Sequence, residues 1–151
     1  MYKHFAISLF IAAMFITACN KTKAPILVSE SRDLEIIDSI MNTQQEAWNN
    51  ASLEGFMEAY WKSDSLMFIG KRGINNGWEN TLTNYKNSYP DALTMGKLKF
   101  TNKHMDRLDS ANAFVIGQWE LFRATDTLSG HYSLVWKKLN GHWTIVADHS
   151  S

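Results

Sequence analysis

The residue types best suited to chemistry gather in the segment NGHWTIVADHSS, residues 140–151, where an acid, an imidazole and two hydroxyls follow an apolar run. Side chains of a regular strand alternate between two faces, so His149 shares a face with Trp143 and Ile145. That face is the apolar one and is expected to meet the core, with Asp148 on the opposite face in a dimer-facing or structural role. An imidazole at the inner face can donate, accept or carry a proton near neutral pH. The sequence therefore makes His149 the candidate ligand contact and catalytic acid/base, unless a bulge changes the alternation, and its alternative role is to cap the sheet end.

The other titratable side chains form no metal or cofactor motif. His104, His131 and His142 are scattered over polar strands or turns, whereas a metal site needs several ligands at short spacing. Asp64 precedes an apolar run and is typical of a turn or cap. There is no glycine-rich phosphate loop. The sequence predicts no metal ion and no cofactor.

The N-terminal region reads as a targeting segment rather than as part of the fold. Lys3 precedes an apolar run, FAISLFIAAMFI, that is shorter than the roughly 20 residues of a membrane span. The run ends in ITAC, with Cys19 as the single cysteine. This pattern resembles a bacterial lipoprotein signal, and the alternative is an ordinary signal peptide followed by an unrelated cysteine. The resemblance implies lipidation of Cys19 after removal of residues 1–18.

Lipidation would place the protein in the bacterial cell envelope. No acidic block follows Cys19, so we expect a lipid-anchored, periplasm-facing protein. Residues 19–32 are predicted to form a polar tether and residues 33–151 a single domain. Without Lys3 the chain carries 14 basic and 15 acidic residues, and there is no basic stripe, which argues against nucleic-acid binding. Attachment to the membrane is expected through lipid on Cys19 rather than through charge.

The domain reads as helices followed by strands. Apolar residues at three- and four-residue spacing predict a helix from about Ser31 to Asn50, a shorter helix capped by Ser52, and a third helix that starts near Trp78 and is stopped by Pro90. The run SDSLMFIG predicts a short strand between the last two. Four strand-like segments follow, and the Asn-Gly pair at Asn140 marks a tight hairpin between the last two strands. The expected class is α+β, with about three helices packed on a curved, mostly antiparallel sheet.

Several weak features in this order resemble the NTF2-like superfamily, in its SnoaL-like and DUF4440 branch. They are the tryptophan late in the first helix, the acid before the first strand, the glycine opening the third helix, and the ending G-x-W-x-I-x-x-x-H; here these are Trp48, Asp64, Gly77, Gly141, Trp143, Ile145 and His149. The resemblance implies a cone whose open end can hold a ligand, and a homodimer through the outer sheet face. The steroid-isomerase members of the family need a carboxylate near Ile69 or Gly70 and a phenol near Gln44. Both groups are missing here, so that chemistry is not expected.

Aromatic residues are abundant enough to line such a cone. The candidate ligand-binding residues are Trp48, Tyr60, Phe68, Trp78, Tyr85, Trp119 and Trp136, together with His149, although each aromatic could equally be part of the core. The leading interpretation is a lipid-anchored domain that binds a small, largely apolar molecule. One alternative is a SnoaL-like enzyme of isomerase, hydrolase or cyclase type that uses His149. The other is a homodimer or protein-association module, in which contact between proteins is the function.

Overall fold

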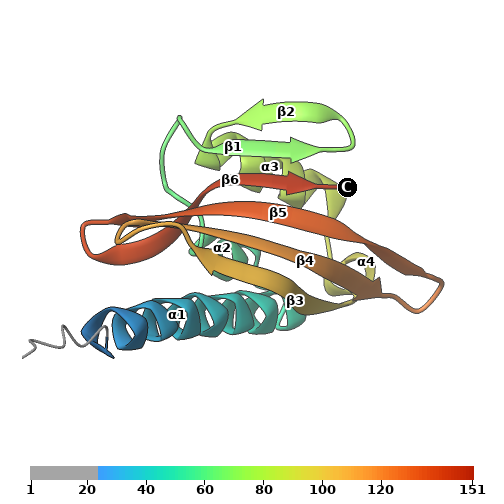
Figure 1. The fold of residues 1–151 in the computed structure, drawn as a ribbon. Helices are drawn as coiled ribbons and strands as arrows, with labels where there is room; N and C mark the ends of the chain where they lie inside the picture. Colours follow the sequence, from blue (N-terminus) through green and yellow to red (C-terminus); the bar gives the residue numbers. More distant parts are fainter. Residues whose placement is uncertain (1–23) are drawn as a thin grey trace, which may run out of the picture.

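The computed structural model describes residues 24–151, with side chains from residue 30 onward. The predicted signal peptide and the lipidation site at Cys19 lie outside the described residues. Figure 1 shows helices packed against a strongly curved sheet. The elements in chain order are α1 (Ala24–Asn49), α2 (Leu53–Met57), β1 (Met67–Gly70), β2 (Gly73–Asn76), α3 (Trp78–Ser88), α4 (Ala92–Met95), β3 (Lys97–Arg107), β4 (Asn112–Phe122), β5 (Thr127–Leu139) and β6 (His142–Ser150).

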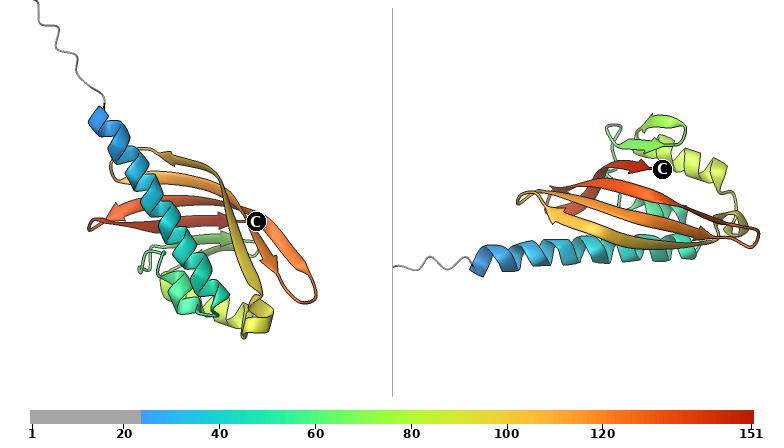
Figure 2. Two further views of the ribbon diagram at one scale, coloured as in Figure 1. Left: turned by 90° about the horizontal axis from the view of Figure 1, so that it is seen from below. Right: turned by 45° about the vertical axis from the view of Figure 1, so that its right-hand side comes forward.

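The first helix begins earlier than predicted. It starts at Ala24 rather than near Ser31, so residues 24–32, predicted as tether, are helical. Its buried stripe runs through Ile37, Met41, Gln44 and Trp48 at three- to four-residue spacing. Figure 2 shows α1 crossing the sheet diagonally on one face. Within residues 24–151, no helix is long and apolar enough to cross a membrane.

The turns around the short helices follow from local chemistry. The side chain of Ser52 accepts a hydrogen bond from the Gly55 backbone and so caps α2, as predicted. Gly77 precedes α3 with a φ of 93°, a conformation that L side chains rarely adopt. Pro90 lies just beyond the end of α3. Helix α4, capped by Asp91, is too short for a periodicity signal and was not predicted.

The sheet has six strands in the order β2-β1-β6-β5-β4-β3, antiparallel throughout except for the parallel pair β1–β6. The hairpin between β5 and β6 turns at Asn140 and Gly141, both with positive φ, as the Asn-Gly pair predicts. The register between β5 and β6 shifts so that Trp136 pairs with Ile145 and Val135 pairs with Ala147, which leaves Val146 as an extra residue. This β-bulge decides which side chains of β6 face inward.

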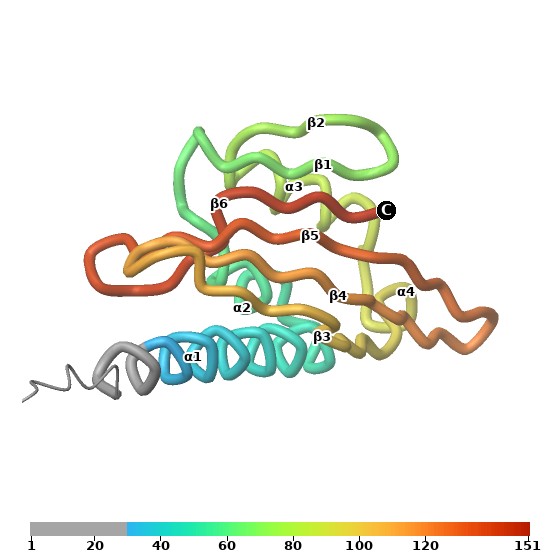
Figure 3. The backbone as a smooth tube through the Cα atoms, viewed as in Figure 1, coloured from blue at the N-terminus to red at the C-terminus, as the bar shows by residue number. Residues whose placement is uncertain are grey.

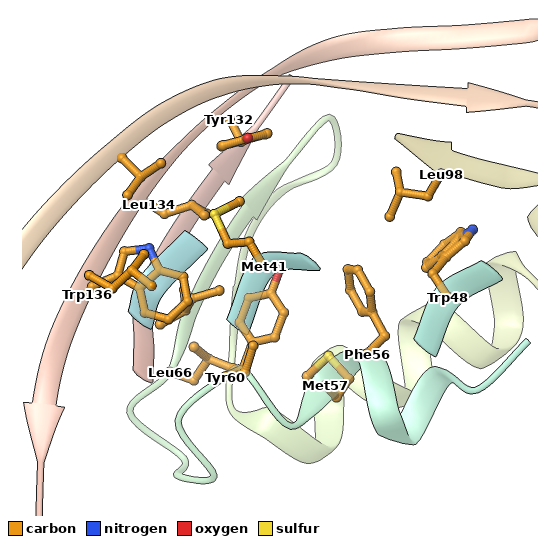
Figure 4. Packing of buried hydrophobic residues seen from close by; sticks show 14 of the residues in the cluster. Met41, Trp48, Phe56, Met57, Tyr60, Leu66, Leu98, Tyr132, Leu134 and Trp136 are labelled. Carbon is orange, nitrogen blue, oxygen red and sulfur yellow. The ribbon is translucent and has the colours of Figure 1, made fainter. Parts of the chain in front are cut away.

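The helices cover the concave face of the sheet, and the core lies between the two layers. The smooth trace in Figure 3 shows β1, β6, β5, β4 and β3 curving in turn around the helical layer. Figure 4 shows Trp48, Phe56 and Tyr60 from the helical side opposite Leu98, Tyr132 and Leu134 from the sheet. The predicted α+β class with helices on a curved, mostly antiparallel sheet is confirmed.

Candidate functional site

A cavity of about 690 Å³ lies between the helices and the sheet. Its walls come from α1, α2, α3, the β1–β2 hairpin and the inner faces of β3 to β6. The β1–β2 turn and the end of β6 lie at the same end of the sheet in Figure 1, next to the end of α3. Its aromatic wall residues are Trp48, Phe56, Tyr60, Phe68, Tyr85, Tyr89, Phe100, Trp119 and Tyr132.

Edge-to-face aromatic contacts hold the helical wall of the cavity. The Trp48 ring lies 5.0 Å from Phe56, 5.9 Å from Tyr85 and 4.8 Å from Tyr89, measured between centroids. Phe68 of β1 joins this group through Tyr85 at 5.7 Å. The indole nitrogen of Trp48 donates to the backbone oxygen of Met95, so its orientation is fixed. Such contacts preorganise an apolar surface made of ring faces and ring edges.

Two glycines let the sheet wall form. Gly117 on β4 lies directly opposite Tyr132 on β5, and a Cβ on Gly117 would overlap the phenol. Gly130 on β5 likewise lies opposite Trp119 on β4. The Tyr132 hydroxyl donates to Asn102 Oδ1 at 2.6 Å. The aromatic rings therefore lie over bare backbone on the neighbouring strand.

One acidic side chain, Asp148, belongs to this wall. It is 3% exposed, and its two carboxylate oxygens each accept a hydrogen bond of 2.6 Å, from Tyr60 Oη and from Ser150 Oγ. Burial raises its pKa to about 6, although the hydrogen bonds from Ser150 and Tyr60 favour the ionised form. Asp148 is therefore a buried carboxyl group that titrates close to neutral pH.

Tyr60 and Tyr85 extend the polar group along the cavity. Burial and the neighbouring Asp148 charge raise the pKa of both phenols well above the ordinary value. Both therefore remain neutral hydrogen-bond donors near neutral pH. Tyr60 follows α2, and its segment pairs with β6, because Trp61 N donates to Ile145 O and Ile145 N donates to Ala59 O. This pairing brings the Tyr60 hydroxyl to Asp148.

The prediction that His149 faces inward is wrong. The bulge at Val146 reverses the alternation, so Asp148 takes the inner face and His149 is exposed on the outer face. There His149 lies in register with Ser133 of β5 and Ile69 of β1, and it does not line the cavity. The sequence does not distinguish the two arrangements, because Ile145, Val146 and Ala147 are all apolar and fit the strand with or without a bulge.

Five of the seven aromatic candidates line the cavity and two do not. Trp48, Tyr60, Phe68, Tyr85 and Trp119 are in its wall.

The other two candidates belong to the core. Trp78 starts α3, two turns before Tyr85 on the same side, and its indole nitrogen donates to the Met57 backbone at 2.9 Å. Trp136 is fully buried on β5. Figure 4 shows it beside Leu66, away from Trp48. Both tryptophans were predicted to line the cavity, but they are buried in the core and do not line it.

A glutamine, Gln44, occupies the position at which the steroid-isomerase members of the family carry a phenol. Gln44 lines the cavity, and its amide nitrogen donates to the Phe56 backbone oxygen at 3.2 Å. Gly70 contributes to the wall without a side chain. In the described part of the chain, no group of three or more His, Cys, Asp or Glu side chains is arranged to hold a metal ion.

Basic residues occur at the β1–β2 turn. Lys71 and Arg72 are exposed and belong to the cavity lining. The Arg72 guanidinium lies 3.5 Å from the Ser88 hydroxyl at the end of α3. Nothing in the sequence pattern separated these two residues from an ordinary solvated turn.

Comparison with known proteins gives matches among solved structures. No protein-family model matches the chain, and no curated protein matches it. An NTF-2 like protein of unknown function from Shewanella oneidensis MR-1 is 39% identical, with a TM-score of 0.77, over 79% of this chain and 98% of that one.

Two more distant structures show the same fold. One is a nuclear transport factor 2 (NTF2-like) superfamily protein from Salmonella enterica serovar Typhimurium, 21% identical, with a TM-score of 0.62, over 85% of this chain and 92% of that one. The other is a domain of unknown function with a cystatin-like fold from Nostoc punctiforme, 18% identical, with a TM-score of 0.69, over 80% and 77%. The identity to the Shewanella protein extends over nearly its whole length, and on this ground the chain belongs to the NTF2-like superfamily.

Proposed function

We propose that the protein binds a small, largely apolar molecule that carries a hydrogen-bond donor. The observation that supports this most directly is the buried Asp148 carboxyl in an aromatic wall. Each carboxylate oxygen already accepts one hydrogen bond, and a carboxylate has about four acceptor sites. Acceptor capacity thus remains for a hydroxyl or N–H of a ligand.

The size and lining of the cavity support the apolar part of the proposal. Its volume of about 690 Å³ lies within the range of roughly 300–1,000 Å³ found for small-molecule sites. Nine of the lining residues are aromatic, and several of their rings contact one another edge to face, which favours an apolar ligand body. A pure association module has no need of such a space, so this arrangement favours the binding interpretation.

The test compares two ligands of nearly equal shape by isothermal titration calorimetry. 2-Naphthol has a donor hydroxyl, and 2-methoxynaphthalene lacks it. We expect the wild type to bind 2-naphthol about tenfold more tightly, because a hydrogen bond to a charged group contributes roughly 1.5 kcal/mol or more. Asp148→Asn should remove most of the preference, whereas the exposed control Glu46→Gln should keep it. Failure of both compounds to bind would contradict the proposal.

A second candidate function is proton transfer on the bound ligand. In place of His149, Asp148 is the acid/base candidate, since its pKa of about 6 suits a group that exchanges protons near neutral pH. A direct test measures α-deuterium incorporation into 2-tetralone, a flat ketone, in D₂O by NMR. Catalysed exchange should increase with pH as Asp148 ionises and should be lost in Asp148→Asn. If exchange is no faster than in buffer, proton transfer is rejected and ligand binding remains as the proposed function.

We also propose that Cys19 anchors the domain to the periplasmic side of the cell envelope. Only residues 20–23 separate Cys19 from the start of α1 at Ala24, so the domain would lie close to the lipid surface. Cys19→Ser should move the protein from the membrane fraction to the soluble fraction. Retention in the membrane fraction would rule out this anchor.

A homodimer through the outer face of the sheet is the proposed assembly. Phe114, Val135, Ala147 and Met67 form one row across β4, β5, β6 and β1 on the face away from the helices. Met67 is 46% exposed, and the row is apolar, which suits burial against a second copy. Analytical ultracentrifugation should show a dimer in the wild type and a monomer in Phe114→Glu. A monomeric wild type would refute it.

A further inference from the structure

We infer that the ligand is an amphipathic anion, with an apolar body among the aromatic rings and a carboxylate held at the β1–β2 turn by Lys71 and Arg72. This inference rests on the proposed binding function and names the chemical class of the ligand. It begins with the charges of the cavity. Its charged side chains are Lys71 and Arg72 at the turn and Asp148 in the wall.

Among the side chains that the structure describes, none forms an ion pair with Lys71 or Arg72. In residues 30–151, ion pairs involve Lys86, Lys99, Arg107, Arg123 and Lys138, but not Lys71 or Arg72. The contact made by Arg72 is with the neutral Ser88 hydroxyl, at 3.5 Å. A guanidinium has five N–H donors, so most of its donors remain available to an anion.

The turn also holds these charges beside apolar surface. Ile74, two residues beyond Arg72, is 69% exposed and belongs to the cavity lining. The Arg72–Ser88 contact joins the turn to the end of α3, where Tyr85 and the residue that follows the helix, Tyr89, form part of the aromatic wall. A cationic group therefore lies next to the rings that would hold an apolar body. This is the arrangement that an aromatic or aliphatic carboxylate requires.

Two parts of the cavity wall then favour different groups of one ligand, although both lie toward the same end of the sheet, since Asp148 is in register with Phe68, three residues before Lys71. Asp148 disfavours an anion in its immediate surroundings, because like charges repel. Lys71 and Arg72 favour the anion at the turn, where the guanidinium fork matches a carboxylate. An amphipathic carboxylate is therefore oriented with its acid at the turn, and any hydroxyl or N–H it carries lies toward Asp148.

The experiment compares 2-naphthoate with its neutral isostere 2-naphthamide by calorimetry at pH 7.5, in low and in moderate salt. Wild type should bind 2-naphthoate about tenfold more tightly. That advantage should shrink as salt screens the exposed charges. The double variant Lys71→Gln/Arg72→Gln should lose the advantage while its affinity for 2-naphthamide stays within about twofold. The matched control Lys103→Gln/Lys137→Gln removes two exposed charges that do not line the cavity and should behave as wild type.

Equal wild-type affinities for the two probes would overturn this inference and leave the proposed binding function intact. An equal loss of affinity for 2-naphthoate and 2-naphthamide in Lys71→Gln/Arg72→Gln would also overturn it. The two residues would then act on the shape of the cavity and not on the anion. If neither 2-naphthoate nor 2-naphthamide binds while 2-naphthol does, the inference that the ligand is a carboxylate is overturned. Absence of binding by all the naphthalene probes would reject the inference and the proposed function together.

Discussion

The hydroxyl of Tyr60 donates a 2.6 Å hydrogen bond to Oδ2 of Asp148, joining the segment after α2 to the last strand of the sheet. The two residues are 88 positions apart. The bond depends on the bulge at Val146, which turns Asp148 inward, and on the backbone pairing of Ala59 and Trp61 with Ile145. The placement of this acid in the cavity is therefore a tertiary property of two segments.

Asp148 is expected to make stability depend on pH in an unusual direction. Its folded-state pKa of about 6 is above the ordinary value of 3.8, so its stabilising contribution is complete below about pH 4 and is lost as pH rises through about 6. Asp148→Asn cannot ionise. Relative to wild type, its free energy of unfolding should therefore increase by up to about 3 kcal/mol between pH 4 and pH 7. Urea unfolding at several pH values measures this difference, and a difference that stays constant with pH would contradict it.

Tyr60→Phe should raise the pKa of Asp148 further. The hydrogen bond from the phenol favours the ionised carboxylate and so lowers the pKa of Asp148. Without it, the increase in pKa caused by burial is offset less. An NMR titration of the Asp148 carboxyl carbon should show a midpoint above that of wild type. Tyr89→Phe is the matched control, because Tyr89 also lines the cavity but is not among the groups that shift the pKa of Asp148. An unchanged midpoint in Tyr60→Phe would show that the hydrogen bond is not formed in solution.

The sequence predicted the elements well because local patterns determine them. The α1 stripe, the Ser52 cap, the Asn140–Gly141 hairpin and the long strands are all set by residues near one another in the chain. The early start of α1 was missed because its first residues, APILVSES, include a proline and several poor helix formers. Proline at the start of a helix is tolerated, so its presence does not mark a tether.

The site was predicted only in part because its register depends on distant contacts. Aromatic type and abundance were enough to name Trp48, Tyr60 and Trp119 as cavity candidates. They could not separate Trp78 from Tyr85, which lie two turns apart on one helix face. Asp148 faces the cavity in place of His149 for one reason, which is the extra residue Val146 in β6. A shift of one residue places every later side chain of a strand on the opposite face.

Gly117→Ala should destabilise the fold by about 2 kcal/mol, because the added methyl group overlaps the Tyr132 phenol. The same change should cost much less in a Tyr132→Leu background, where the overlapping hydroxyl and outer ring atoms are gone. Chemical denaturation of the four proteins of this double-mutant cycle measures the coupling. Simple additivity of the two substitutions would mean that Tyr132 does not lie over Gly117.

Asp33→Asn should loosen the beginning of α1 from the sheet. Asp33 is 5% exposed, and its carboxylate lies 2.8 Å from both Arg107 Nε and Lys138 Nζ. It also accepts a hydrogen bond from Trp143 Nε1. Burial alone would raise its pKa, but the hydrogen bonds from Lys138 and Trp143 and the charges of Lys138 and Arg107 lower it overall.

A lowered pKa means that this contribution to stability is present at neutral pH and is lost as the pH falls through the folded-state value. Removing the charge leaves Arg107 and Lys138 without their partner, so Asp33→Asn should lower the free energy of unfolding at pH 7 by about 3 kcal/mol. The control is Glu46→Gln, an exposed carboxyl on the same helix, with an expected change within about 0.5 kcal/mol. Urea denaturation compares the two. Equal stabilities of the two variants would mean that Asp33 does not hold α1 to the sheet, since both lose one negative charge from the same helix.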